Sequence, residues 1–199
     1  MLTRALSWTV KEPGCKVTVA NPTDAELVQA CLDGRRDAFD VIVERHQRHV
    51  YQLCYRFAGN HEDANDLAQD VFIRAYRGLR TFKGQASLGT WLYRIGVNVC
   101  LTKVGAKRPV EPLEPLLTAN DDRIASQEET APEALLRGER ASRVRAAIAR
   151  LPKKQRATLV LRVYHDLPHE QIAGILGSSV GAVKANFFHA LNNLKKLLS

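Results

Sequence analysis

The chain has 199 residues, 45% of them apolar and 25% charged, which is the balance of a globular protein with room for one domain or two small ones. No apolar run approaches the ~20 residues that cross a bilayer, and no apolar segment follows Arg4 as it would in a signal peptide. The formal charge is +8, and residues 135–199 hold 12 Lys and Arg against 3 Asp and Glu. This basic excess favours a surface that meets nucleic acid, although a merely soluble basic domain has the same composition.

The cysteines and histidines give no pattern of a metal site. The four cysteines have no C-x-x-C spacing and predict neither a metal nor a disulfide framework, which favours a reducing cytosolic compartment. They are Cys15, Cys31, Cys54 and Cys100. His46 and His49 are three residues apart on an expected helix, but no Cys or carboxylate nearby in the sequence completes a site. We therefore expect both histidines on a solvated helix surface.

The chain begins with a segment of low periodicity and then two helices. Residues 1–22 predict a flexible leader, because they combine proline and glycine with no hydrophobic repeat. Thr23 and Glu26 have the spacing of a capping box, which predicts a helix from there to about Gly34. A longer helix follows and should end at Gly59, since glycine commonly terminates a helix.

A further helix is expected next, ending at about Leu79. Its apolar residues recur at spacings of three and four and predict one buried face. That face consists of Ala64, Leu67, Ala68, Val71, Phe72, Ala75, Tyr76 and Leu79. The opposite face consists of Asp66, Gln69, Asp70, Ile73 and Arg77. Ile73 is a bulky apolar residue among polar ones, which favours a docking face, although isolated exposed apolar residues are common.

A loop at residues 80–85 and another helix come next. The loop holds cations beside Phe82, and Ser87 is a plausible N-cap. The expected buried side of the helix is Leu88, Trp91, Leu92, Ile95 and Val99. Cations and rings around a loop suit single-stranded nucleic acid, because cations follow the phosphates and rings stack on unpaired bases. For Trp91, the helical periodicity favours a core position instead.

This stretch carries a family resemblance. Region 2 of the bacterial RNA polymerase sigma factors, and in particular of the extracytoplasmic-function (ECF) group, closely resembles DLAQDVFIRAYR followed by FKGQAS and TWLYRIGVN. In that family the acidic helix docks on the clamp of the polymerase beta-prime subunit. The loop and the next helix open the minus-ten promoter element and capture a flipped base. The resemblance implies a polymerase-facing set of Asp66, Gln69, Asp70, Ile73 and Arg74. It implies a minus-ten set of Lys83, Gly84, Gln85, Ser87, Trp91, Tyr93, Arg94 and Asn98.

Residues 104–134 are expected to be a linker. They contain four prolines, and their 7 acids outnumber their 3 bases, a composition that disfavours a packed core. An acidic connector can mimic nucleic acid and lie in the channel that RNA would fill. In the ECF group a segment between the two domains does run through the polymerase active cleft. A plain tether is the alternative.

Residues 135–199 predict a second helical domain that ends in a helix-turn-helix. Pro152 and Gly177 mark helix boundaries, and Ser178 or Ser179 can cap the last helix. The expected buried stripe of that helix is Val180, Val183, Phe187, Ala190, Leu191, Leu194, Leu197 and Leu198.

The open face of the last helix carries residue types that suit duplex DNA. Phe188 and His189 lie off the buried stripe, with Lys184 on its flank. A phenylalanine can contact a thymine methyl, and a lysine can reach phosphate or guanine. Contact of Phe188 with another protein domain is the alternative.

This half also resembles the family. Region 4, which reads the minus-thirty-five element and touches the polymerase beta flap, is similar to LPKKQRATLVLRVYHDLPHEQIAGILGSSVGAVKANFFHALNNLKKLL. The resemblance implies a minus-thirty-five set of Ser179, Gly181, Lys184, Ala185, Phe188 and His189. The family commonly places arginines after the V-K pair, where this chain has Asn186 and His189 followed by Leu191. We therefore expect a changed sequence preference or a weaker contact there.

The patterns together predict an all-α protein of two small domains, residues 23–103 and 135–199, on a flexible linker. The resemblance implies a cytoplasmic sigma factor, not an enzyme, that is monomeric outside its complexes and needs no cofactor, metal or small-molecule substrate. Its implied partners are core RNA polymerase, promoter DNA and an anti-sigma factor that can hold it near the membrane. One alternative is a polymerase-independent helix-turn-helix regulator, which would need a dimer seam although no sustained heptads occur. The other is a degenerate sigma-like protein that occupies polymerase without reading promoters.

Overall fold

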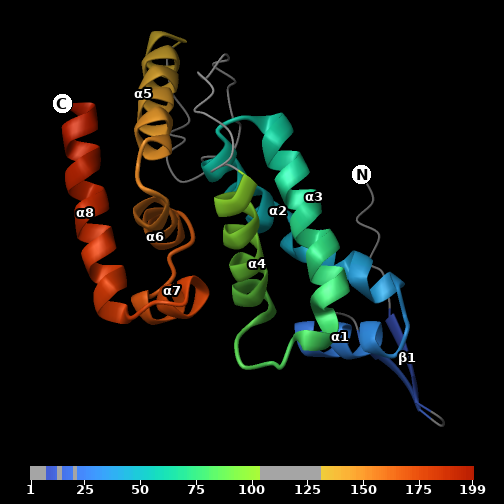
Figure 1. Ribbon diagram of the computed structural model, residues 1–199. Coiled ribbons are helices and arrows are strands. Elements are labelled where there is room, and N and C mark those ends of the chain that lie inside the picture. Colours follow the sequence, from blue (N-terminus) through green and yellow to red (C-terminus); the bar gives the residue numbers. More distant parts are fainter. Residues whose placement is uncertain (1–7, 13–14, 20–21, 104–130) are drawn as a thin grey trace.

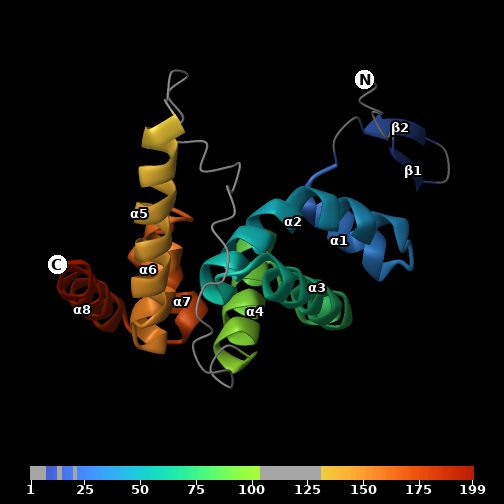
Figure 2. The same ribbon diagram turned by 90° about the horizontal axis from the view of Figure 1, so that it is seen from above.

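The computed structural model describes residues 8–12, 15–19, 22–103 and 131–199, with side chains over 22–103 and 138–199. The described helices form two domains, within residues 24–103 and 131–198, that lie side by side, as two views at right angles show (Figures 1 and 2). The expected all-α fold of two domains is confirmed. None of the described helices has the length and hydropathy of a transmembrane span.

The N-terminal domain packs four α-helices around one core. They are α1 (Asp24–Leu32), α2 (Asp37–Ala58), α3 (His61–Gly78) and α4 (Leu88–Lys103), with a short 3-10 turn, η1 (Leu79–Thr81), after α3. The capping box is present, since the Thr23 hydroxyl accepts from the Glu26 amide and the Glu26 carboxylate accepts from the Thr23 amide. Gly59 ends α2 with φ 84°, a left-handed conformation that glycine adopts without a Cβ clash.

Helices α2, α3 and α4 approach most closely at Gly96. A Cβ built there would lie 2.7 Å from Leu53 Cδ2 of α2 and 3.7 Å from Val71 Cγ2 of α3. Both neighbours are fully buried, so neither has space to withdraw. Because Gly96 has no side chain, α4 can pack closely against α2 and α3 at this point.

The C-terminal domain consists of α5 (Ala131–Ala149), α6 (Lys153–Val163), α7 (His169–Leu176) and α8 (Val180–Leu198). Helix α8 lies against α5, α6 and α7. Gly177 ends α7 with φ 58°, and the Ser179 hydroxyl caps α8 by accepting from the Ala182 amide at 3.2 Å. The helix-turn-helix and its cap are therefore as expected. The second domain begins earlier than the sequence indicates, because α5 starts at Ala131.

The expectation that residues 1–22 form a flexible leader is wrong for part of that segment. Strands β1 (Trp8–Glu12) and β2 (Cys15–Val19) form an antiparallel hairpin with Trp8 opposite Val19. The sequence does carry the corresponding signal, since the Pro13–Gly14 pair separates two runs rich in valine and threonine. Most of the expected linker, residues 104–130, lies outside the described residues. The expectation that it lies in an RNA channel therefore stays a prediction.

Three further expectations on burial are wrong. Tyr76 is 47% exposed and packs edge-on against Phe39, with ring centroids 4.9 Å apart. Leu191 and Leu197 are 45% and 38% exposed. His46 is not on a solvated surface: its Nε2 lies 3.1 Å from the Asp24 carboxylate, which also accepts from Arg45 and so ties α1 to α2. No group of three or more metal-ligating side chains occurs among the described residues.

Candidate protein-docking groove and nucleic-acid surfaces

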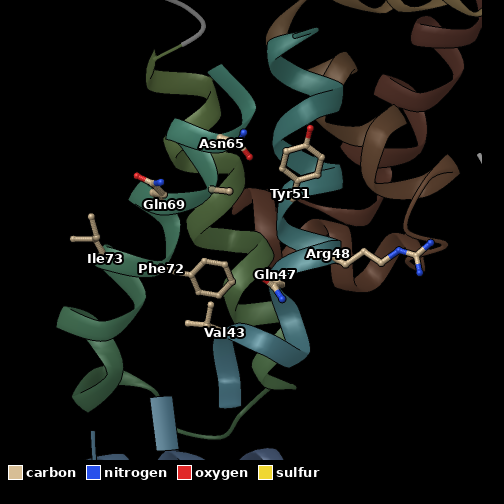
Figure 3. A pocket seen from close by; sticks show the side chains of 9 residues that line it. Val43, Gln47, Arg48, Tyr51, Asn65, Gln69, Phe72 and Ile73 are labelled. Carbon is tan, nitrogen blue, oxygen red and sulfur yellow. The ribbon is translucent and has the colours of Figure 1, made fainter. Parts of the chain in front are cut away.

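A groove of about 740 Å³ runs between α2 and α3 (Figure 3). Its lining combines apolar side chains with amides and a phenol. From α2 come Val43, Gln47, Arg48 and Tyr51, and from α3 come Asn65, Ala68, Gln69, Phe72 and Ile73. In Figure 3 the Phe72 ring lies between the two helices, with Val43 beside it. An apolar floor with amide groups at its rim can seat an apolar side chain of a protein partner and hydrogen-bond its neighbouring polar groups.

Only two of the five residues expected to face polymerase line the groove. Gln69 and Ile73 line the groove, and Ile73 is 48% exposed, which confirms it as an apolar residue on the outer face of α3. Asp66 and Arg74 are exposed but do not line the groove. Asp70 turns toward the other side of α3, where its carboxylate pairs with the Lys103 ammonium at the end of α4.

Sequence reasoning missed the α2 half of the groove. Val43, Gln47 and Tyr51 are spaced four residues apart, so they lie along one stripe of α2 that faces α3. The Tyr51 hydroxyl is hydrogen-bonded to His61 Nδ1, and partial burial raises the pKa of that phenol. A periodic pattern within α2 could have indicated this stripe, but only the packing of two helices shows that it forms a groove.

The expected minus-ten set forms an open surface around the loop after α3. Lys83, Gly84, Gln85 and Ser87 are all exposed, and Gly84 has φ 68°. The Ser87 hydroxyl accepts from the Thr90 amide at 3.1 Å, which confirms it as the N-cap of α4. The loop therefore presents a cation and an amide on a backbone turn that glycine permits.

The α4 members of this set divide between two faces. Trp91, Arg94 and Asn98 are at i, i+3 and i+7 and so lie on one side of the helix, where Arg94 and Asn98 are exposed. Trp91 is half-buried against Phe82, with ring centroids 5.4 Å apart. Tyr93 lies apart from them: its ring packs against His165 of the C-terminal domain at 4.7 Å.

The expected minus-thirty-five set forms a second open surface. Gly181, Lys184, Ala185 and Phe188 are at i, i+3, i+4 and i+7 of α8, and all four are exposed, Phe188 to 62%. His189 is exposed next to Phe188, and Ser179 caps the helix. The N-terminal half of α8 thus presents one face with a single lysine and a large ring beside a helix N-terminus, a geometry that suits a major groove and its phosphates.

Comparison with known proteins agrees with this geometry. Residues 42–109 match the family model of Sigma-70 region 2, and residues 141–194 match that of Sigma-70 region 4. The chain is 34% identical over 181 residues to the RNA polymerase sigma-H factor of Pseudomonas aeruginosa, an alignment that covers 88% of this chain and 93% of the relative. It is 32% identical over 170 residues to the ECF RNA polymerase sigma factor SigW of Bacillus subtilis, covering 83% and 91%.

A solved structure shares the fold. The sigma factor RpoE, in complex with the anti-sigma factor NepR from Bartonella quintana, matches with a TM-score of 0.60 at 19% identity, over 80% of this chain and 96% of that chain. The two domains, their order and the sequence identities together define the class: the chain belongs to the ECF RNA polymerase sigma factors. Members of this family are transcription initiation factors that bind core RNA polymerase and promoter DNA.

Proposed function

We propose that this chain binds core RNA polymerase through the groove between α2 and α3, directs it to promoters and helps open the minus-ten element. The observation that carries the proposal is the groove with the exposed Ile73 at its edge, because Ile73 there extends an apolar lining that includes Val43 and Phe72 and is not an isolated surface residue. The chain itself catalyses no step, and the polymerase supplies the chemistry.

The partner subunits follow from the family resemblance. The beta-prime clamp would occupy the groove, with Gln69 and the rim amides as hydrogen-bonding groups. The beta flap would meet the C-terminal domain, whose exposed Leu191 and Leu197 offer apolar contacts. Since core polymerase is a cytoplasmic enzyme, we place the chain in the cytoplasm.

Promoter recognition would be shared between the two open surfaces. Lys83, Arg94 and Asn98 lie where a melted minus-ten strand would pass, and Lys184 and Phe188 where a minus-thirty-five duplex would lie. Phosphate contacts would supply salt-dependent affinity, and base contacts would set the promoter class.

Control by an anti-sigma factor is part of the proposal. The related RpoE is bound to its anti-sigma factor NepR, and the α2–α3 groove of this chain is open to any partner that competes with polymerase. An inhibitor seated there would release the chain only on a signal. Full promoter activity in the presence of every co-encoded candidate inhibitor would exclude this control.

Binding to sigma-free core polymerase separates this function from the regulator that acts alone on DNA. We expect the full chain to form a stoichiometric complex with core polymerase without DNA, and we expect that complex to bind a template already melted at minus ten. A polymerase-independent regulator would bind duplex DNA and leave the polymerase unoccupied. A degenerate sigma-like protein would bind polymerase but would not select any template.

A further inference from the structure

The two domains are joined by a specific set of contacts. Helix α4 lies beside α7 in both views, and α2 contacts α6 (Figures 1 and 2). The buried apolar residues of both domains belong to one continuous cluster. Two tethered domains in loose contact would have two separate cores. The shared core therefore indicates an interface whose buried apolar side chains stabilise the contact between the domains.

Arg156 of α6 is buried in the interface. It is 7% exposed, and its Nη2 donates to the backbone carbonyls of Phe57 and, at 3.2 Å, of Arg56, in the last turn of α2. Those carbonyls have no helical amide to accept from, and the negative end of the helix dipole favours a cation there. Burial lowers the pKa of Arg156 only to about 10, so the guanidinium remains charged at neutral pH.

A second arginine makes the reverse contact. The Arg56 guanidinium of α2 lies 3.8 Å from the ring centroid of Tyr164, which follows α6. Each domain therefore places one arginine on the other, and each contact is lost when the domains part.

The third contact involves a residue of the minus-ten set. The Tyr93 hydroxyl lies 3.1 Å from His165 Nδ1, and burial raises the pKa of Tyr93. His165 lies in the turn between α6 and α7, in which Asp166 has the left-handed φ of 51°. While this contact persists, Tyr93 is not available to a DNA base.

The geometry of a promoter also requires the domains to separate. The centres of the two promoter elements are about 25 base pairs apart, or about 85 Å at 3.4 Å per pair. A compact chain of 199 residues is only about 40 Å across. The 27 residues from 104 to 130 can span about 90 Å when extended, so the connection is long enough to allow separation.

We propose that the contact of α6 and α7 with α2 and α4 is an autoinhibitory latch. In the latched form the contact with His165 keeps Tyr93 from DNA, and the domains must separate before the chain engages a promoter. The inference rests on the proposed function, because it takes Tyr93, which the family resemblance places in the minus-ten set, as a residue that contacts the melted strand. The faces around Lys83 and Lys184 stay exposed in the latched form, so the latch acts on Tyr93 and on the separation of the domains.

The test measures domain separation and polymerase engagement on the same full-length protein. Donor and acceptor dyes are attached through azide-bearing amino acids at Glu62 and Lys195, which are both exposed, so the native cysteines stay unlabelled. We expect high energy transfer in the free chain and a loss of transfer when core polymerase and a promoter are added. His165→Ala should lower the transfer of the free chain.

The variant should also bind better. If the latch leaves about a tenth of the free chain open, releasing it raises the apparent affinity for core polymerase with a promoter by up to about tenfold. Arg56→Ala removes a second contact on the surface of α2 and should act in the same direction. His169→Ala is the matched control, because that ring packs against Phe187 within the C-terminal domain, and it should keep the transfer of the wild type.

Three results would overturn the latch: low transfer in the free wild type, transfer that does not change in the promoter complex, or variants that open without a gain in affinity although the wild type binds core polymerase. Circular dichroism of each variant separates opening from unfolding. A different result would refute the proposed function alone. If the variants open as expected but no form of the chain engages polymerase, the contact between the domains stands and the initiation function does not.

Discussion

Substitution of Ile73 tests the docking groove. Complete burial of an isoleucine side chain contributes about 1.5–3 kcal/mol, and Ile73 is 48% exposed in the free chain. A partner that covers the exposed half therefore gains about 1 kcal/mol from it, so Ile73→Ala should weaken binding to core polymerase about fivefold. Ile73→Asp should weaken binding by more than about thirtyfold, because the partner would have to desolvate a carboxylate.

The assay is a titration of sigma-free core polymerase into the labelled full chain, read as fluorescence anisotropy. Leu32→Ala is the matched control, since this leucine is 40% exposed at the end of α1 and does not line the groove. We expect it to bind like the wild type. Wild-type affinity for Ile73→Asp with an unchanged melting temperature would refute the argument, as would an equal loss of affinity for Ile73→Ala and Leu32→Ala.

Other substitutions test the packing, the DNA surface and the latch. Gly96→Ala places a Cβ 2.7 Å from Leu53 Cδ2 and should lower the free energy of unfolding by about 1 kcal/mol in chemical denaturation. Gly174→Ala is the control: an added Cβ there meets none of the described atoms within 4 Å, so this variant should be slightly more stable than the wild type. Lys184→Ala should weaken duplex binding at the minus-thirty-five element, lower the salt slope by about one and leave opening of a pre-melted template intact; loss of that opening would count against the assignment. Burial, with His49 and Arg56 of α2 nearby, lowers the pKa of His165 from 6.5 to about 4, against the opposing charge of Asp166. A proton therefore binds His165 more readily in the open form than in the latched form. The latch is intact above about pH 6.5, and its stability falls by up to about 3 kcal/mol as the pH falls to 4. Energy transfer should decrease over that range in the wild type but not in His165→Gln.

Local signals in the sequence predict most of the helices correctly. The Thr23 capping box, the glycine ends at Gly59 and Gly177, and the Ser87 and Ser179 caps all occur where expected. These features depend on residues within one turn of each other, so a single sequence is sufficient to find them.

Features that depend on packing between helices could not be read in the same way. The apolar repeat of α8 continues to Leu197, but an apolar repeat does not show whether other helices extend far enough to cover it, and Leu191 and Leu197 stay exposed. The groove needs one stripe from α2 and another from α3, and neither stripe alone predicts it. Tyr93 matched the family as a DNA residue, and only the arrangement of the two domains shows that it contacts His165.

Transcription by sigma-free core polymerase tests the central claim most directly. Fragmented genomic DNA from the source organism serves as the template, and the 5′ ends of the transcripts are mapped with and without the full chain. The account predicts discrete transcripts with fixed start sites that appear only when the chain is added, and that share sequence elements near minus ten and minus thirty-five. An absence of added start sites, under conditions in which the chain is bound to the polymerase, would contradict the initiation function.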